Sequence, residues 1–578
     1  MRVNIEAQPE VASSGAVRSR LGPIGWVDVV LVAVLVGAIG GVVYLAGSAT
    51  GPAEGVEVSL SPQMLPLYTA LSIGRLLAAY VISILFSIAF GYAAASSKRA
   101  ERILLPTLDV LQSTPITSFL PAVLLGFAAI MPARWAAEAA SVVLIVTCQA
   151  WNIGFAWYQA LTTAPPSLSD AATVFRFNGW LRFKSLQLPF AAVSLIWNSM
   201  VSWANGWFFL MVAEMLRLGG RDFRLLGLGS YLQEAANQGN AAALGWGIVT
   251  LLVVIVALDQ LVWRPLLAWS ARFVPQTDEE EPPRAWFHDL LRTSRLIERL
   301  TLRVERAVDA FDRLIIGRFP ARRVYEAEQR GGARAGLVVA AAVLAGAAWG
   351  LVRSGHLLTQ VSAAEWWEIT VGIGATFVRV VLALLLSLAW TLPVGVAIGT
   401  RPRLAARFQP IVQLAASVPA TALFPAVLWL IPHTGLGLNI AGVALMVAGT
   451  QWYLLFNILA GASSIPAEMH HSTALLGLSR WQRWRYLILP SLLPNLVTGA
   501  VVATGGAWNV CVVAEYVQMR GQILEITGAG ATIQHAAAVG NYPLLLAATL
   551  ALVVVVVLVN RTVWGRLYAL ASDRYRLE

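Results

Sequence analysis

The sequence predicts an all-α polytopic membrane protein with about 12 transmembrane helices, arranged as two parallel six-helix repeats. Three observations predict this fold class. The chain is 58% hydrophobic and only 12% charged, whereas soluble domains are about 25% charged. Apolar runs long enough to cross a hydrocarbon core of about 30 Å as helices recur along the chain. Matching residues at fixed offsets indicate that the second half repeats the first.

The apolar runs define the expected spans. The first run, residues 26–46, is longer than the apolar core of a secretory signal peptide, so we expect a retained helix. The other spans of the first half are predicted near residues 70–95, 105–130, 138–160, 190–214 and 245–265. Those of the second half are predicted near residues 335–352, 369–399, 408–432, 437–460, 492–517 and 543–563.

Basic residues predict the orientation, because Lys and Arg accumulate in cytoplasmic loops. The loop 47–69 contains neither residue type, whereas Lys98, Arg99 and Arg102 crowd the next connection. Three arginines between residues 401 and 407 do the same in the second half. We therefore expect a multi-pass chain with cytoplasmic N- and C-termini.

The repeat keeps two registers. An even number of spans in each half makes the two copies parallel, related by an axis along the membrane normal. At an offset of 304, Arg75, Gly91, Pro106 and Pro115 match Arg379, Gly395, Pro410 and Pro419. At an offset of 301, Trp151, Trp180, Pro189, Trp207, Glu214 and Gly227 match Trp452, Trp481, Pro490, Trp508, Glu515 and Gly528.

The predicted domains are an N-terminal tail (1–25), a first repeat (26–265), a charged linker (266–334) and a second repeat (335–578). In the linker, apolar residues recur at helical spacing with arginines between them. Two readings stay open: an amphipathic helix on the inner membrane face or on a cytoplasmic partner, and a simple spacer. The helix would use Leu290, Ile297, Leu300, Val304, Val308, Phe311 and Ile315.

A pair of loops follows the fourth span of each half. Asp170 to Pro189 aligns without gaps on His471 to Pro490. Each loop predicts a short helix, a break, a second helix rich in basic and aromatic residues, and a Leu-Pro that opens the next span. Gly477 suits the break, because a left-handed turn costs glycine little.

These loops resemble the cytoplasmic coupling loop of type I ABC importer permeases. The motifs Arg-Trp-Gln-Arg-Trp-Arg (480–485), Val-Ala-Glu (212–214, 513–515) and Gly-x-Gly (227–229, 528–530) resemble the nitrate, taurine, sulfonate and bicarbonate branch in a duplicated, fused form. The resemblance covers nearly the whole chain except the linker. It implies that both halves are permease repeats in a bacterial inner (plasma) membrane. It also implies that each loop docks on an ATPase subunit.

The residues that the resemblance assigns to ATPase coupling lie in both loops. The first loop has Arg176 where the family has glycine, and a non-glycine residue in a left-handed turn costs roughly 1 kcal/mol. We therefore expect the first loop to turn differently, which leaves inequivalent docking and relaxed drift both open. The coupling set is Asp170, Ala171, Ala172, Arg176, Trp180, Arg182, Pro189, His471, Gly477, Arg480, Trp481, Arg483 and Pro490.

A substrate pathway is expected near the midplane between the repeats, where ionisable residues inside spans are functional candidates. Alternatively, the glutamates pair locally at the outer boundary and the tryptophans form an interfacial belt. Arg217, Arg221 and Arg224 break the inside-positive pattern and suit a small anion or the acidic face of a delivery protein. The candidate pathway residues are Gln149, Asn152, Trp203, Trp207, Glu214, Trp508 and Glu515.

The sequence excludes an ATPase within this chain. Neither lysine, Lys98 nor Lys184, follows a glycine, so there is no phosphate-binding GxxxxGK[ST] loop. Cys148 and Cys511 lie in apolar spans and predict no metal site. We expect a non-enzymatic permease that binds no cofactor. Its partners would be two cytoplasmic ATPase subunits that carry ATP and Mg²⁺, and an extracytoplasmic solute-binding protein. The alternative is a secondary transporter of the major-facilitator type.

Overall fold

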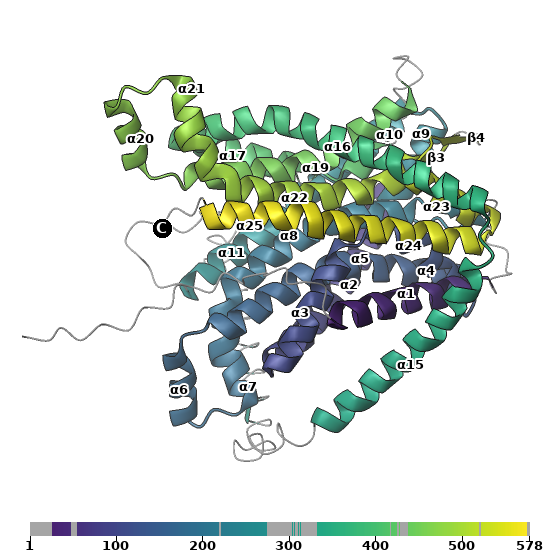
Figure 1. Ribbon diagram of the computed structural model, residues 1–578, viewed down its shortest axis with the longest axis horizontal. Helices are drawn as coiled ribbons and strands as arrows, with labels where there is room; N and C mark the ends of the chain where they lie inside the picture. Colours follow the sequence, from purple (N-terminus) through teal and green to yellow (C-terminus); the bar gives the residue numbers. More distant parts are fainter. Residues whose placement is uncertain are drawn as a thin grey trace, which may run out of the picture.

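The computed structural model describes residues 26–47, 55–218, 221–273, 332–416, 418–424, 437–519 and 522–574, together with residues 303, 306, 310, 312, 313 and 427. Within these residues, 7 helices are long and apolar enough to cross a membrane, and two shorter apolar helices accompany them. The predicted all-α membrane fold is confirmed. Figure 1 shows long helices that run side by side between two ends of the molecule.

The first half begins with one helix that precedes the repeat's core. Its core helices are α2 (Leu65–Ala95), α5 (Ala133–Thr163) and α8 (Leu188–Glu214). The remaining elements are α1 (Trp26–Ala46), η1 (Pro62–Met64), α3 (Lys98–Ser113), α4 (Ile116–Ala128), α6 (Pro166–Val174), α7 (Gly179–Arg182), η2 (Phe183–Gln187), β1 (Arg217–Leu218), β2 (Arg221–Asp222), α9 (Leu228–Asn237), α10 (Ala241–Leu258), η3 (Asp259–Trp263), α11 (Arg264–Ser270) and η4 (Ala271–Phe273).

The second half repeats this order. Its core helices are α16 (Ala363–Gly399), α19 (Leu438–Ser463) and α22 (Leu489–Ala514). Both copies place their short loop helices at one end of the molecule and their β-hairpin region at the other (Figure 1), so the repeats are parallel as predicted. The remaining elements are α15 (Gly332–Leu358), α17 (Pro402–Ala416), α20 (Ala467–Leu475), α21 (Arg480–Arg483), η5 (Trp484–Ile488), β3 (Tyr516–Met519), β4 (Gln522–Glu525), α23 (Ala529–Val539), α24 (Tyr542–Val559), η6 (Asn560–Trp564) and α25 (Gly565–Arg574).

The predicted single span at 105–130 is wrong. It consists of two helices, the amphipathic α3 and the apolar α4, with Thr114 and Pro115 in extended conformations between them. The ring of Pro115 disfavours helical backbone at the preceding residue, so the helix ends there. The second half has the same break, because α17 ends at Ala416 and helix resumes at Ala420, after Pro419.

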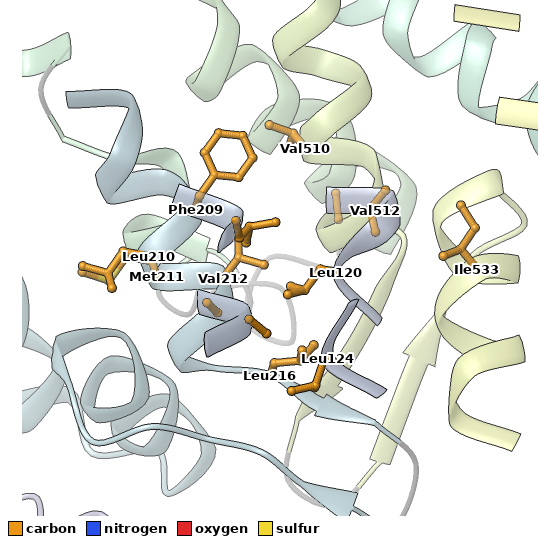
Figure 2. Close-up of a cluster of buried hydrophobic side chains, with 14 of the residues drawn as sticks. Leu120, Leu124, Phe209, Leu210, Met211, Val212, Leu216, Val510, Val512 and Ile533 are labelled. Atoms are coloured by element: carbon orange, nitrogen blue, oxygen red, sulfur yellow. The ribbon is translucent and has the colours of Figure 1, made fainter. Parts of the chain in front are cut away.

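The two halves contact each other through equivalent hydrogen bonds. The hydroxyl of Thr117 on α4 donates to the backbone oxygen of Asn509 on α22 at 2.8 Å. Its repeat counterpart Thr421 donates to the backbone oxygen of Phe208 on α8 at 3.3 Å. Figure 2 shows the apolar core at this junction, where α4 and α8 of the first half meet α22 and α23 of the second. Its labelled side chains include Leu120, Leu124, Leu210, Met211, Val510, Val512 and Ile533.

Short antiparallel hairpins follow the last core helix of each half. β1 pairs with β2, which sets Arg217 opposite Asp222. β3 pairs with β4, which sets Tyr516 opposite Glu525. At the other end, π-helical turns η2 and η5 join the loop helices to α8 and α22. Such turns are rare and concentrate at functional positions, and here the duplication preserves both.

Between residues 274 and 331 the structure describes five residues, all of them helical: Arg303, Arg306, Ala310, Asp312 and Arg313. The choice between an amphipathic helix and a simple spacer stays open. The seven apolar positions of the predicted amphipathic helix lie outside the described residues, and so does Arg520.

Candidate functional site

Two buried carboxylates anchor the hairpin end of the molecule. Glu214, the last residue of α8, is fully buried. It accepts hydrogen bonds from Ser72 Oγ at 2.7 Å, Arg75 Nη1 at 2.9 Å and the backbone nitrogen of Gly229 at 2.8 Å. Arg75 lies on α2, so this ion pair ties the loop after α8 to a different core helix. Inside a membrane protein, such a charge is stable only when it is paired.

The second half builds the same cluster. Glu515 is fully buried and accepts from Thr376 Oγ1, Arg379 Nη1 and the backbone nitrogen of Gly530, each at 2.8 Å. Every one of these residues is the repeat counterpart of a residue in the first cluster. We call the two sets the Arg75–Glu214 lock and the Arg379–Glu515 lock.

The locks differ in one partner. Arg75 also donates to both carboxylate oxygens of Glu138, at 2.6 and 2.8 Å. At the equivalent position Arg379 donates to the amide oxygen of Asn439, at 3.1 and 2.8 Å. The first lock therefore holds two acids around one arginine, whereas the second holds one acid.

Glycines make room for both carboxylates. A Cβ added to Gly227 would lie 2.2 Å from the Glu214 carboxylate, and one added to Gly528 would lie 2.2 Å from that of Glu515. A side chain at either position would have to displace the buried carboxylate from its hydrogen bonds, which accounts for the first glycine of each Gly-x-Gly motif. The second glycine supplies the donating backbone nitrogen in each lock.

The paired loops adopt the same fold, and the expectation that the first turns differently is wrong. Arg176 has φ of 53° and Gly477 has φ of 64°, so both sit in the left-handed region. Equivalent bonds close the turns: Phe177 N to Ala172 O at 2.9 Å, and Leu478 N to Thr473 O at 3.1 Å. The native turn thus overrides the local preference of Arg176, at a cost of roughly 1 kcal/mol.

The second helix of each loop is capped by a side chain. Asn178 accepts from Leu181 N at 2.8 Å, and Ser479 accepts from Gln482 N at 3.3 Å.

The predicted coupling residues differ in how far they are exposed. Ala172 is the buried residue of the set. The half-buried residues are Ala171, Trp180, Arg182, Pro189, Arg483 and Pro490. The exposed residues are Asp170, Arg176, His471, Arg480 and Trp481, together with Gly477 at the turn.

Asp312 of the linker contacts the first of the two loops. Trp180 Nε1 donates to Asp312 Oδ1 at 2.6 Å, and Lys184 forms an ion pair with the other carboxylate oxygen. The hydrogen bonds from Lys184 and Trp180 hold the pKa of Asp312 below its usual value. In contrast Trp481, the counterpart of Trp180, is 71% exposed.

A cavity of about 470 Å³ lies between the halves, toward the end that carries the paired loops. We call it the inner cavity. Its first-half wall includes Trp203, Trp207 and Trp263, and its second-half wall includes Trp452, Tyr453 and Asn457. The hydroxyl of Tyr453 donates to Asn205 Oδ1 at 3.0 Å, directly across the two halves.

A smaller pocket of about 80 Å³ lies between the two hairpins, and we call it the outer pocket. Gln233 and its repeat counterpart Gln534 line it together with Arg217. Arg217 lies 3.2 Å from Asp222, and Arg224 contacts both Asp222 at 2.8 Å and Glu234 at 2.7 Å. Local carboxylates thus surround two of these three arginines. Burial lowers the pKa of Arg224, but the hydrogen bonds and charges of Asp222 and Glu234 outweigh it, so that pKa is raised.

The predicted pathway residues lie in different parts of the structure. Trp203 and Trp207 line the inner cavity, whereas Glu214 and Glu515 belong to the locks. Gln149 is buried and accepts from Ser83 at 3.3 Å, Trp508 packs beside Phe377, and Asn152 is half-buried on α5. Their role in a pathway stays a prediction.

Sequence reasoning missed Tyr453 and Asn457 at the cavity, and the partners of both glutamates. A detectable signal existed for the first pair, because two polar side chains four residues apart on an apolar span share one helix face. For the glutamates, the only signal was that Arg75 and Arg379 are ionisable residues within predicted spans.

This architecture is that of a membrane transport permease. It combines two fused helical repeats, a pair of loops at one end and cavities between the halves. A model of the binding-protein-dependent transport system inner membrane component family matches residues 83–262 and again 391–574. The chain belongs to this family of ABC transporter permeases, as a duplicated, fused member.

Several curated transport proteins resemble part of this chain. It is 30% identical over 146 residues to the taurine transport system permease protein TauC of Escherichia coli (25% of this chain, 51% of the relative). It is 26% identical over 145 residues to the nitrate import permease protein NrtB of Synechococcus elongatus (25% and 50%). It is 33% identical over 151 residues to the riboflavin transport system permease protein RibX of Chloroflexus aurantiacus (25% and 51%). The chain spans about half the length of these relatives.

Proposed function

We propose that this chain carries both membrane halves of the permease of an ATP-driven importer. Two cytoplasmic ATPase subunits, which carry ATP and Mg²⁺, would dock on residues 165–189 and 466–490. The observation that carries the proposal is the duplicated loop. In each half a short exposed helix, a left-handed turn and a capped basic-aromatic helix lead through a π-helical turn into a core helix. Movement of the loop would therefore pass directly into α8 or α22.

The orientation follows from this role. The end with the paired loops would face the cytoplasm, together with both termini, and the hairpin end would face an extracytoplasmic solute-binding protein. The outer pocket would receive solute there. Relatives named for taurine and nitrate support a small anionic substrate, and a relative named for riboflavin extends the solutes to a ring system. No relative supports the secondary-transporter alternative.

Co-purification tests the proposal. The tagged chain is extracted gently from its native membranes, and accompanying proteins are quantified by mass spectrometry. We expect an ABC ATPase at two copies per chain, and ATP hydrolysis that rises when the complex is reconstituted with its solute-binding protein. A chain that purifies without an ATPase, and whose uptake in vesicles follows a proton gradient, would instead be a secondary transporter.

A further inference from the structure

The two paired loops carry equivalent pairs of side chains on their basic-aromatic helices. In the first loop Trp180 lies on α7 and Lys184 on the π-helical turn η2. At the repeat offset of 301, their counterparts are Trp481 on α21 and Arg485 on η5. Side chains four residues apart on a helix share one face. We call the two sets the Trp180–Lys184 pair and the Trp481–Arg485 pair.

The Trp180–Lys184 pair binds a carboxylate. Trp180 Nε1 donates to one oxygen of Asp312 at 2.6 Å, and Lys184 Nζ donates to the other oxygen. The Asp312 side chain is only 14% exposed in this contact. Hydrogen bonds to an ionised group are roughly twice as strong as those between neutral groups. An indole N–H and a cation at this spacing therefore form a receptor for one acidic side chain.

The Trp481–Arg485 pair offers the same donors to solvent. Trp481 is 71% exposed, and Arg485 is exposed as well. Among the residues that the structure describes, no carboxylate lies within ion-pair distance of Arg485. A guanidinium suits a carboxylate at least as well as an ammonium does, because its N–H donors lie in one rigid plane. The second pair can therefore bind the kind of ligand that the first pair holds.

The loops themselves contain no acid for these pairs. Residues 171–213 and 469–514 include neither aspartate nor glutamate. The first pair takes its carboxylate from the linker, 128 residues after Lys184. Because Asp312 occupies the first pair, it is not available to the second.

Apolar side chains around the second pair indicate that its ligand belongs to a protein. Leu475, Leu476 and Tyr486 are all exposed on the same loop. Exposed apolar side chains among arginines are typical of protein interfaces, where aromatic residues and arginine are enriched. A small free anion would leave these apolar side chains in water, whereas a docked protein would cover them.

We propose that the Trp481–Arg485 pair binds an aspartate or glutamate side chain of the ATPase subunit that docks at the second loop. Asp312 fills the equivalent place at the first loop. The two docking sites are therefore inequivalent, because one presents an open carboxylate receptor and the other a filled one. This inference rests on the proposed permease function and names the chemistry of the partner's contact.

Cross-linking without a spacer tests the inference. A water-soluble carbodiimide joins an amine to a carboxylate that touches it, with loss of water. The chain suits this chemistry because Lys98 and Lys184 are its only lysines. In the complex of the full chain with its co-purified ATPase, we expect the unchanged protein to form a cross-link between Lys184 and Asp312.

The variant Arg485→Lys adds an amine to the second pair and keeps the charge. We expect it to cross-link to an aspartate or glutamate of the ATPase, which mass spectrometry of the digested product identifies. Adding Trp481→Phe keeps a ring but removes the indole donor, and should lower the yield about fivefold. Arg401→Lys is the matched control, because Arg401 is exposed at the same end of the molecule; its cross-linking to the ATPase should stay at background.

Several results would overturn the inference. One is an ATPase that co-purifies with Arg485→Lys but forms no cross-link to the new amine. Another is a cross-link from that amine to the linker, whether of the same chain or of a second copy. Absence of the Lys184–Asp312 product, an unchanged yield with Trp481→Phe, or an equal yield from Arg401→Lys would also contradict it. In all these cases the co-purified ATPase still supports the permease function, whereas a chain that purifies without an ATPase rejects both proposals.

Discussion

The carboxylate of Glu214 accepts a hydrogen bond from Arg75 at 2.9 Å although 139 residues separate them, and Glu515 repeats the contact with Arg379 at 2.8 Å. Each lock joins the last turn of one core helix to the middle of another. Because the locks lie beside the hairpins, they fix the geometry of the end where we place solute entry. The first lock has Glu138 where the second has Asn439. Changes to the two locks should therefore alter the free energy of unfolding by different amounts.

Removing the carboxylate charge should destabilise the second lock more than the first. In Glu515→Gln, Arg379 is left buried with no counter-charge, which costs about 3–5 kcal/mol. In Glu214→Gln, Arg75 keeps Glu138, so the loss should be smaller. Thermal unfolding of the purified chain measures both, and Glu138→Asn, which copies the second lock, is the control. Equal losses in the two glutamine variants would contradict this account.

The glycine that faces Glu214 should tolerate no side chain. A Cβ at position 227 overlaps the carboxylate, so Gly227→Ala should lower stability by about 1–3 kcal/mol, the usual cost of overpacking. Gly245→Ala is the matched control, because a Cβ there meets nothing within 4 Å and alanine favours helix. Comparing unfolding midpoints checks this, and a stable Gly227→Ala protein would show that the lock can shift.

The two loop turns should respond oppositely to substitution. Arg176→Gly relieves left-handed strain and should stabilise the first loop by roughly 1 kcal/mol, less the entropy that glycine adds to the unfolded chain. Gly477→Ala should destabilise the second loop by a similar amount through backbone strain alone, because open space surrounds the added Cβ. Hydrogen exchange at residues 172–178 and 473–479 measures both changes. Identical effects in the two loops would rule out this explanation.

Asp312 should hold the linker on the first loop across physiological pH. Its pKa lies below its usual value because Lys184 and Trp180 donate to the carboxylate. The contact is therefore fully present above the unfolded-state pKa of about 3.9 and is lost as pH falls through the lower folded-state pKa. Asp312→Asn should loosen the linker, at a cost of about 0.5–1 kcal/mol for a partly exposed pair.

Hydrogen exchange near residues 180–187 at pH 5 and pH 8 checks the linker contact. Protection relative to the intrinsic exchange rate at each pH should be alike at both values in the unchanged protein and lower at both in Asp312→Asn. Arg313→Ala, one residue away and exposed, is the control. Protection that depends on pH in this range would point to a different titrating group.

Periodicity and repeat offsets predicted the fold class, the parallel duplication and the paired loops, because these depend on local apolar length and on residue identity at fixed spacing. They failed at 105–130, where apolar content continues across the break that Pro115 imposes. They also failed to pair Arg75 with Glu214, since that contact is set by how α2 and α8 pack. At the inner cavity, Trp203 and Trp207 were predictable, because they are aromatic residues on an apolar span that also contains polar residues. Tyr453 was not, because its role depends on the approach of the other half.

The basic-aromatic helix of the second loop provides the sharpest test of coupling. Reversing charge at Arg480, Arg483 and Arg485 should abolish ATP-driven uptake while the protein remains folded in the membrane, because electrostatic mismatch at a docked surface costs several kcal/mol. Arg480→Glu with Arg485→Glu alone, both exposed, avoids disturbing the half-buried Arg483. A matched control reverses the exposed Arg401, Arg403 and Arg407 at the same end of the molecule. Uptake and ATPase co-purification are measured for each variant, and full activity of the loop variants would remove the docking role from this helix.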